Sequence, residues 1–372
     1  MLNFVSKHFL KLSLLFYVFG IAQILVIAYG DQNLAGLFPW KLTQFYVNYI
    51  DFGFVKRGVV GTLLYPVFSQ IGGQAASAAI VIVFADFLVF LSLLLLLRRA
   101  MENLFPANSE LMMVIKTIIV VSPVGVIQLS YDAGRFDHLN FILAGCALML
   151  LLERRFVLAG MSVAVGVLVH EAMILFVFPV LMAACLTLIG KSGNLTERLR
   201  LAAGFALLPV LAAGLVAFRG NPGVDLASVL PPSVMQGADV WGRSFFQPAL
   251  SLSIQQYIVL LFYLVMPYVL LRKFYQANHL EVDLIFIFAL SPLALFALGI
   301  DYARWTHLAF VSVLIAIFFH VANSRGSFSV RELGLPKFGL FFYILPLGPI
   351  GITRALPYVE AILNRILGNV AA

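Results

Sequence analysis

Charged residues are scarce in this chain. Asp, Glu, Lys and Arg make up 11% of its 372 residues, whereas hydrophobic residues make up 62%. A soluble protein of this length needs more polar surface than that to face water. The composition therefore excludes an ordinary soluble globule and indicates that lipid surrounds most of the surface.

Cysteines and nucleotide-binding signatures are scarce as well. Cys146 and Cys185 both lie inside apolar runs, which favours neither a disulfide framework nor a thiolate metal site. The net charge of +7 comes without a run of basic residues interleaved with aromatics, so it does not predict nucleic-acid binding. A glycine-rich phosphate loop is also missing from the sequence.

Long apolar runs dominate what is present. The hydrocarbon core of a bilayer is about 30 Å thick, and each run approaches the length that crosses it as a helix. The first run lacks a small-residue cleavage site, so we expect an uncleaved span. The prediction is an all-α, polytopic transmembrane helix bundle of about 10–11 spans, forming a single integral membrane domain over 1–372. The expected spans are 9–29, 75–97, 111–131, 139–153, 156–169, 172–190, 201–218, 254–271, 282–300, 305–322 and 338–353.

Lysine and arginine sort by side when the N-terminus is placed inside. Every loop predicted to face inward carries basic residues, as the positive-inside rule requires. The expected location is thus the inner (cytoplasmic) membrane of a bacterium, with several passes. A surplus remains on the outward side, which topology does not require: Lys41, Lys56, Arg57, Arg135, Arg219, Arg243, Arg304, Arg354 and Arg365.

Two outward loops are long. The first, 30–74, contains the apolar piece Gly58 to Phe68, which is too short to span and is predicted to lie as an interfacial helix or to re-enter. The second, 219–253, combines prolines and glycines with Trp241, and it is typical of a lid-like loop over the outward face.

The first polar motif lies in the loop 30–74. Asp51 precedes the basic pair Lys56 and Arg57, and the glycines around them permit tight turns. A carboxylate upstream of two cations suits a site that activates a hydroxyl while it holds a phosphate. The alternative is that the two cations only anchor an interfacial helix to lipid headgroups.

The second motif, at the turn between two predicted spans, is the densest. Arg135 offers a planar fork of donors for a phosphate, and Asp132 or Asp137 is placed to orient it or to act as a base beside His138. So many polar residues are unnecessary to reverse a helix pair. The alternative is a hydrogen-bonded turn in which Arg135 pairs with one aspartate.

The third motif is the pair His170 and Glu171, in the middle of the apolar stretch 156–190. The pair is costly near a membrane unless it is satisfied or used, and we expect acid, base or donor roles. The zinc-protease spacing is absent because Ile174 stands where the second histidine belongs. A divalent cation stays an alternative if the turns meet, with ligands from Asp132, Asp137, His138, His170 and Glu171.

The fourth motif joins Asp301, Arg304 and Trp305 at another outward helix end. Aromatic planes beside polar donors suit sugar rings, whereas the alternative is an ion pair on one helical face beneath an interfacial aromatic belt. Two further charges lie inside predicted spans, Asp86 and Lys116, which are expected either to pair or to point toward the nearer surface.

Together these motifs predict an anionic, lipid-anchored substrate. The many spans, the long first outward loop with Asp51 before an interfacial helix, and the outward arginines resemble the membrane glycosyltransferases of the GT-C class and bacterial O-antigen polymerases. That resemblance implies a transferase that uses a polyprenyl-phosphate or -pyrophosphate glycan in polysaccharide biosynthesis. It also implies Asp51 as the catalytic carboxylate, with Arg57, Arg135 and Arg304 as phosphate contacts; Asp137 and Glu171 stay open as the base.

Two other functions remain open. A carrier or flippase for lipid-linked glycans would use the same arginines without breaking bonds. An acyl or phosphoryl transferase would use His170 as the base of its nucleophile. The expected partners are a polyprenyl-linked glycan, membrane lipids and other polysaccharide-assembly proteins. No cofactor beyond an optional divalent cation is expected.

Overall fold

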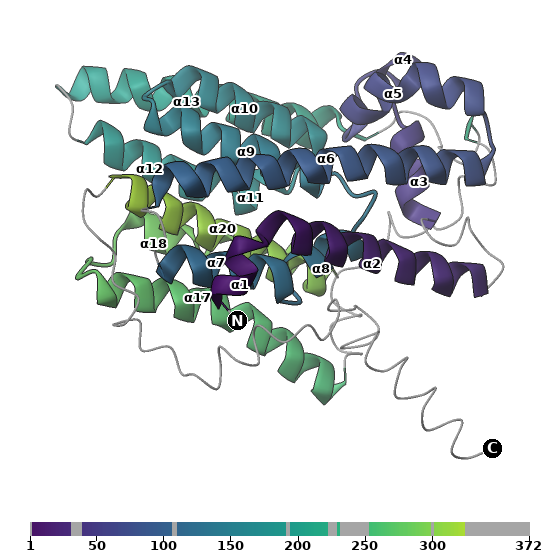
Figure 1. Cartoon of the computed structure of the whole chain (residues 1–372). Helices are drawn as coiled ribbons and strands as arrows, with labels where there is room; N and C mark the ends of the chain where they lie inside the picture. The colour runs from purple at the N-terminus through teal and green to yellow at the C-terminus, as the bar shows by residue number, and fades with distance from the viewer. Residues whose placement is uncertain are drawn as a thin grey trace. The chain divides into compact units, whose positions relative to one another are not determined.

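The computed structural model describes residues 2–30, 39–105, 110–190, 194–221, 229–230, 253–298 and 301–323 (Figure 1). Every element within these ranges is a helix, and none of them contains a strand. The all-α prediction is therefore confirmed for this part of the chain. The predicted span at 338–353 and most of the predicted lid at 219–253 lie outside the described residues.

Five of the described helices are long and apolar enough to cross a membrane. This agrees with the polytopic character expected from the sequence. The remaining apolar helices are shorter, between 10 and 17 residues. The five candidate spans are Ala76–Leu104, Glu110–Tyr131, Leu195–Arg219, Ile254–Ala277 and Arg304–Asn323.

The chain divides into two compact units, each assembled from separate segments. Unit 1 takes Met1–Ile21, Arg98–Asp132 and the described part of Ser244–Ala372, while unit 2 takes Ala22–Leu97 and Ala133–Arg243. The division passes through α2 (Phe9–Gly30) and α6 (Ala75–Leu104).

Unit 2 contains most of the predicted motifs. Within it, α10 packs against both α9 and α13, and α3 packs against α5 (Figure 1). Besides parts of α2 and α6, its helices are α3 (Pro39–Tyr46), α4 (Tyr49–Phe52), α5 (Gly58–Ile71), α9 (Asp137–Leu152), α10 (Phe156–Val169), α11 (Met173–Phe176), α12 (Phe178–Ile189) and α13 (Leu195–Arg219).

Unit 1 pairs α17 with α20 and α1 with α7. Besides parts of α2 and α6, its described helices are α1 (Leu2–Lys7), α7 (Glu110–Val121), α8 (Val126–Tyr131), α17 (Ile254–Ala277), α18 (Leu284–Phe288), the 3-10 turn η3 (Ser291–Ala294), α19 (Leu295–Leu298) and α20 (Tyr302–Asn323).

The predicted span 282–300 differs from expectation. It consists of the short pieces α18, η3 and α19 rather than one continuous helix. Pro292 stands in the first turn of η3, where its missing amide hydrogen and fixed φ interrupt a regular α-helical ladder. Hydropathy alone does not detect this break, because the flanking residues other than Ser291 are apolar.

The helix predicted at Gly58 to Phe68 is present as α5 and extends to Ile71. Its start packs closely on the chain that precedes α4: a Cβ at Gly61 would lie 2.0 Å from the carbonyl oxygen of Val47. Leu63 and Val67 are exposed on the other face. A helix with apolar side chains on its exposed face suits an interfacial position.

One hydrophobic cluster holds the polar turns of unit 2 in place. Phe45 of α3 contacts Phe68 of α5 and packs edge-on against Phe136, with ring centroids 5.0 Å apart in the latter pair. Val169, the last residue of α10, belongs to the same cluster. Because Phe136 and Val169 each border a polar motif, apolar burial brings those motifs close to α3 and α5.

Candidate functional site

Asp51 stands exposed on the short helix α4. Asn48 caps this helix by accepting hydrogen bonds from the amides of Ile50 and Asp51 at 2.9 and 2.8 Å. The Asn48 side-chain amide also donates to Asp51 Oδ2 at 2.9 Å. The carboxylate is therefore oriented by its own helix cap while it stays accessible.

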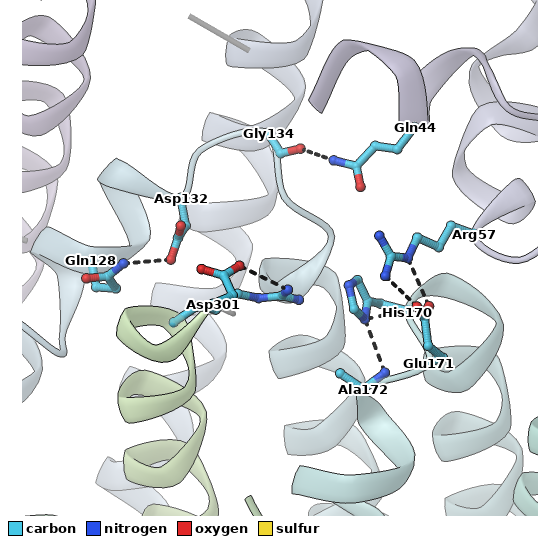
Figure 2. Close-up of polar contacts among 10 residues, drawn as sticks. Gln44, Arg57, Gln128, Asp132, Gly134, His170, Glu171, Ala172 and Asp301 are labelled. Atoms are coloured by element: carbon cyan, nitrogen blue, oxygen red, sulfur yellow. Dashed lines mark hydrogen bonds and ion pairs between the residues drawn. The ribbon is translucent and has the colours of Figure 1, made fainter. Parts of the chain in front are cut away.

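Arg57 binds Glu171 across 114 residues of sequence (Figure 2). Its Nε donates to Glu171 Oε2 at 2.9 Å, and its Nη2 donates to Oε1. The backbone amide of neighbouring Lys56 donates to the Gly220 carbonyl at the end of α13, at 2.8 Å. The turn before α5 is thus attached to two other turns of unit 2.

The Arg57 backbone is unusual. Its φ of 63° lies in the left-handed region, which costs a residue with a Cβ about 1–2 kcal/mol. Such conformations persist where the surrounding structure determines them, and they cluster at functional sites.

Glu171 is ionised in this arrangement. Burial raises the pKa of its carboxyl, but the charge and the hydrogen bonds of Arg57 outweigh burial and hold that pKa well below its ordinary value. A carboxylate bound by both donors of an arginine fork is a poor proton acceptor. In this state Glu171 is a counter-ion rather than a base.

His170 adopts an extended backbone after α10 and its side chain is buried. Its Nδ1 accepts the Ala172 amide at 3.2 Å, as Figure 2 shows. That bond requires the lone pair on Nδ1, so the imidazole proton sits on Nε2. His170 is therefore built as a donor through Nε2, which disfavours the role of general base.

The turn that carries the second motif is held by α3. Lys41 Nζ donates to the Ala133 carbonyl at 2.8 Å. Gln44 Nε2 donates to the Gly134 carbonyl, also at 2.8 Å (Figure 2). Gly134 has a φ of 82°, a conformation that favours glycine. Lys41 thus acts on a backbone carbonyl within unit 2.

The side chains that follow this turn point into the protein. Arg135 and Asp137 are buried. His138 is buried too, and its Nδ1 lies 2.8 Å from Asp86 Oδ1 of α6. The charge inside the second predicted span therefore has a histidine partner. Asp137 is too enclosed to meet a substrate hydroxyl directly.

Asn140 links this turn to the third motif. Its Nδ2 donates to the His170 carbonyl at 3.2 Å, while its buried Oδ1 accepts no hydrogen bond from the described residues. The Arg57–Glu171 pair and the Asn140 contact together connect three of the four predicted motifs within unit 2, and Gln44 ties the second of them to α3. The sequence offered no signal for Gln44 or Asn140, because a single amide in an apolar run is uninformative.

Asp132 belongs to unit 1. It is buried, and Gln128 Nε2 donates to its Oδ2 at 2.9 Å. The second motif is thus divided between the two units immediately after Asp132.

The fourth motif also lies in unit 1. Arg304 Nη1 and Asp301 Oδ2 are 3.7 Å apart, three residues along the chain, which is the ion pair named among the alternatives (Figure 2). Trp305 is buried in an aromatic group with Phe296 and Tyr302. His307 Nδ1 hydrogen-bonds to the Val124 carbonyl. These contacts satisfy a helix junction of unit 1.

A second polar group in unit 1 was not predicted. The Tyr275 hydroxyl lies 2.8 Å from Asp283 Oδ1 and 2.6 Å from His320 Nε2. Asp283 also caps α18 by accepting the Phe286 amide. The contacts join the ends of α17, α18 and α20, whose residues are far apart in sequence.

The divalent-cation alternative finds no assembled ligand set among the described residues. No three His, Cys, Asp or Glu side chains gather there in a way that holds a metal ion. Within unit 2, His138 faces Asp86 and Glu171 faces Arg57. His138 and Glu171 are thus engaged with separate partners.

Comparison with known proteins adds no name to this site. No protein-family model, curated protein or solved structure matches the chain.

Proposed function

We propose that this protein is a membrane glycosyltransferase that transfers a glycan from a polyprenyl-phosphate or -pyrophosphate carrier. The observation that carries the proposal is the arginine fork of Arg57, partly open to solvent and already occupied by a carboxylate, on the same loop as exposed Asp51. Such a fork matches a phosphate as well as it matches a carboxylate. A candidate base and an anion-binding group therefore share one loop.

Burial and pairing distinguish the three carboxylates that the sequence offered as the catalytic base. Asp51 is exposed, Asp137 is buried, and Glu171 is bound by Arg57. Asp51 is accordingly the base in this proposal. The acceptor hydroxyl oxygen bonds to the anomeric carbon and its proton passes to Asp51. The bond from that carbon to the carrier oxygen breaks, and the electron pair leaves on the phosphate, which Arg57 stabilises.

The test uses purified protein, a lipid-linked oligosaccharide and an acceptor glycan. We expect a lengthened glycan and free carrier phosphate. Asp51→Asn should lower the transfer rate by about 10²–10⁴-fold, the usual contribution of a general base. Glu153→Gln, which removes an exposed carboxylate of the same unit, is the matched control and should leave the rate unchanged.

A carrier for lipid-linked glycans is the second candidate, and the buried pair of Asp86 and His138 favours it. A buried carboxylate–imidazole pair between two apolar helices, here α6 and α9, is typical of ion-coupled transport. Vesicle assays distinguish the two functions. If the intact lipid-linked glycan moves across the membrane and no transferred product forms, the protein is a carrier and not an enzyme.

A further inference from the structure

The Arg57 fork is accessible although it is occupied. About a fifth of the Arg57 side chain and a third of the Glu171 side chain are exposed. Both Glu171 oxygens take the two donors that a phosphate would use, Nε and Nη2. A soluble or lipid-anchored anion can therefore approach the pair from solvent and compete for the same hydrogen bonds.

The surroundings of Arg57 favour an anion with more charge than one carboxylate. Arg57 is the N-cap of the fourteen-residue helix α5, and its side chain makes no cap hydrogen bond to that helix. Lys56 precedes it. The Arg57 backbone therefore lies at the positive end of the helix dipole and next to Lys56 in sequence, and both features favour a phosphate.

Glu171 is placed so that it can leave. It lies in the turn between α10 and α11, not inside either helix. The backbone of this turn is held independently, because Asn140 donates to the His170 carbonyl and the Ala172 amide donates to His170. A rotation of the Glu171 side chain consequently frees Arg57 while the turn keeps its position.

We infer that Glu171 is an internal stand-in for the carrier phosphate, and that a lipid-linked phosphate binds Arg57 by displacing it. The inference rests on the proposed function and adds to it how the site binds its substrate. An internal competitor lowers apparent affinity, because only the fraction of protein with an open fork can bind. It also keeps an exposed arginine from capturing weak anions such as chloride.

Binding of a polyprenyl phosphate to the purified protein in detergent tests the exchange without any turnover. Glu171→Gln keeps the shape of the side chain and removes its charge. We expect it to bind the polyprenyl phosphate about tenfold more tightly, equivalent to about 1.4 kcal/mol. The control Glu153→Gln breaks the exposed pair with Arg155 in the same unit and should leave the affinity unchanged.

Arg57→Ala should weaken binding, and Arg57→Ala combined with Glu171→Gln should bind no more tightly than Arg57→Ala alone, because the two residues act through one contact.

Polyprenol and inorganic phosphate serve as ligand controls. If polyprenol does not bind, the phosphate is the recognised group. If Glu171→Gln binds inorganic phosphate as well as the lipid more tightly than the unaltered protein does, the site recognises phosphate itself. Melting temperatures establish that each variant is folded, and Glu171→Asp, with its shorter reach, should tighten binding to an intermediate degree.

The exchange would be overturned if both folded Glu171 variants bound the polyprenyl phosphate no more tightly than the unaltered protein. It would also be overturned if Glu171→Gln increased the affinity equally in a protein that carries Arg57→Ala. The glycosyltransferase proposal fails separately. If Glu171→Gln binds the polyprenyl phosphate tightly but the unaltered protein transfers no glycan, the exchange at Arg57 stands and the enzymatic function is wrong.

Discussion

Two arginine–carboxylate pairs, one in each unit, illustrate how differently the same chemistry is built. In unit 1, Arg304 and Asp301 lie 3.7 Å apart and only three residues apart along the chain. In unit 2, Arg57 and Glu171 are 114 residues apart and joined by two hydrogen bonds. The first pair follows from local helical geometry. The second requires several helices to pack correctly and an arginine held in a left-handed conformation, so it is the better candidate for a selected function.

Turnover gives the largest expected difference between the two pairs. Arg57→Ala should lower the rate of glycan transfer by about 10²–10³-fold, the usual cost of removing one group that stabilises developing charge. Arg304→Ala, the matched change in unit 1, should lower the rate per folded protein less than about threefold, which is under 1 kcal/mol, since Arg304 has no role in the proposed reaction. The measurement is transfer from a lipid-linked oligosaccharide at saturating acceptor. Equal losses in the two variants would remove the distinction between the pairs.

At the two arginine positions, backbone conformation should decide whether the glycine variant or the alanine variant is the more stable, and the two positions should give opposite answers. At position 57 the left-handed φ favours glycine, so Arg57→Gly should be more stable than Arg57→Ala by about 1 kcal/mol. Arg304 lies in the first turn of α20, where glycine should be less stable than alanine by about 0.5–1 kcal/mol. Thermal unfolding of the four variants in one detergent measures both differences. The same order at both positions would contradict the left-handed assignment of Arg57.

Acidification gives the smallest expected effect. Arg57 lowers the pKa of the Glu171 carboxyl in the folded protein, so the pair contributes stability above the ordinary glutamate pKa of about 4.3. This contribution is lost as the pH falls through the lowered pKa. We expect about 1 kcal/mol or less, because solvent reaches part of both side chains.

The acid effect is measured as the difference in melting temperature between the unaltered protein and Glu171→Gln at pH 7 and at about pH 2. The difference should shrink on acidification. A constant difference would show that the carboxylate charge does not stabilise the fold.

Much of the helical layout followed from hydropathy. The ranges predicted for α6, α9, α10 and α17 agree with the observed helices within a few residues at most of their ends. Uninterrupted apolar runs leave few other ways to satisfy the backbone hydrogen bonds. The exceptions are the C-terminal ends of α6 and α17, which extend beyond the predicted ends. Breaks at proline within such runs were harder to foresee. Pro292 interrupts one predicted span, whereas α17 continues through Pro267. Neighbouring packing, not the residue type, decides between those outcomes.

The candidate site was predicted less completely. Asp51, Arg57 and Glu171 stood out because ionisable residues are costly next to apolar runs. Gln44 and Asn140 did not, since neutral amides carry no such signal, although they hold the polar turns of unit 2. Of the acid, base and donor roles expected for His170, the structure favours the donor, because its Nδ1 accepts a backbone amide that no sequence pattern indicates.

Composition and the spacing of apolar runs were sufficient to determine the helical class and the short list of polar turns, because burying backbone and apolar side chains away from water imposes those features locally. Only the tertiary structure decided which charges meet. Arg57 pairs with Glu171, and His138 pairs with Asp86. Electrostatic contact requires separations of a few ångströms between residues far apart in sequence, and the packing of Phe45, Phe68 and Phe136 sets the positions of the unit 2 turns.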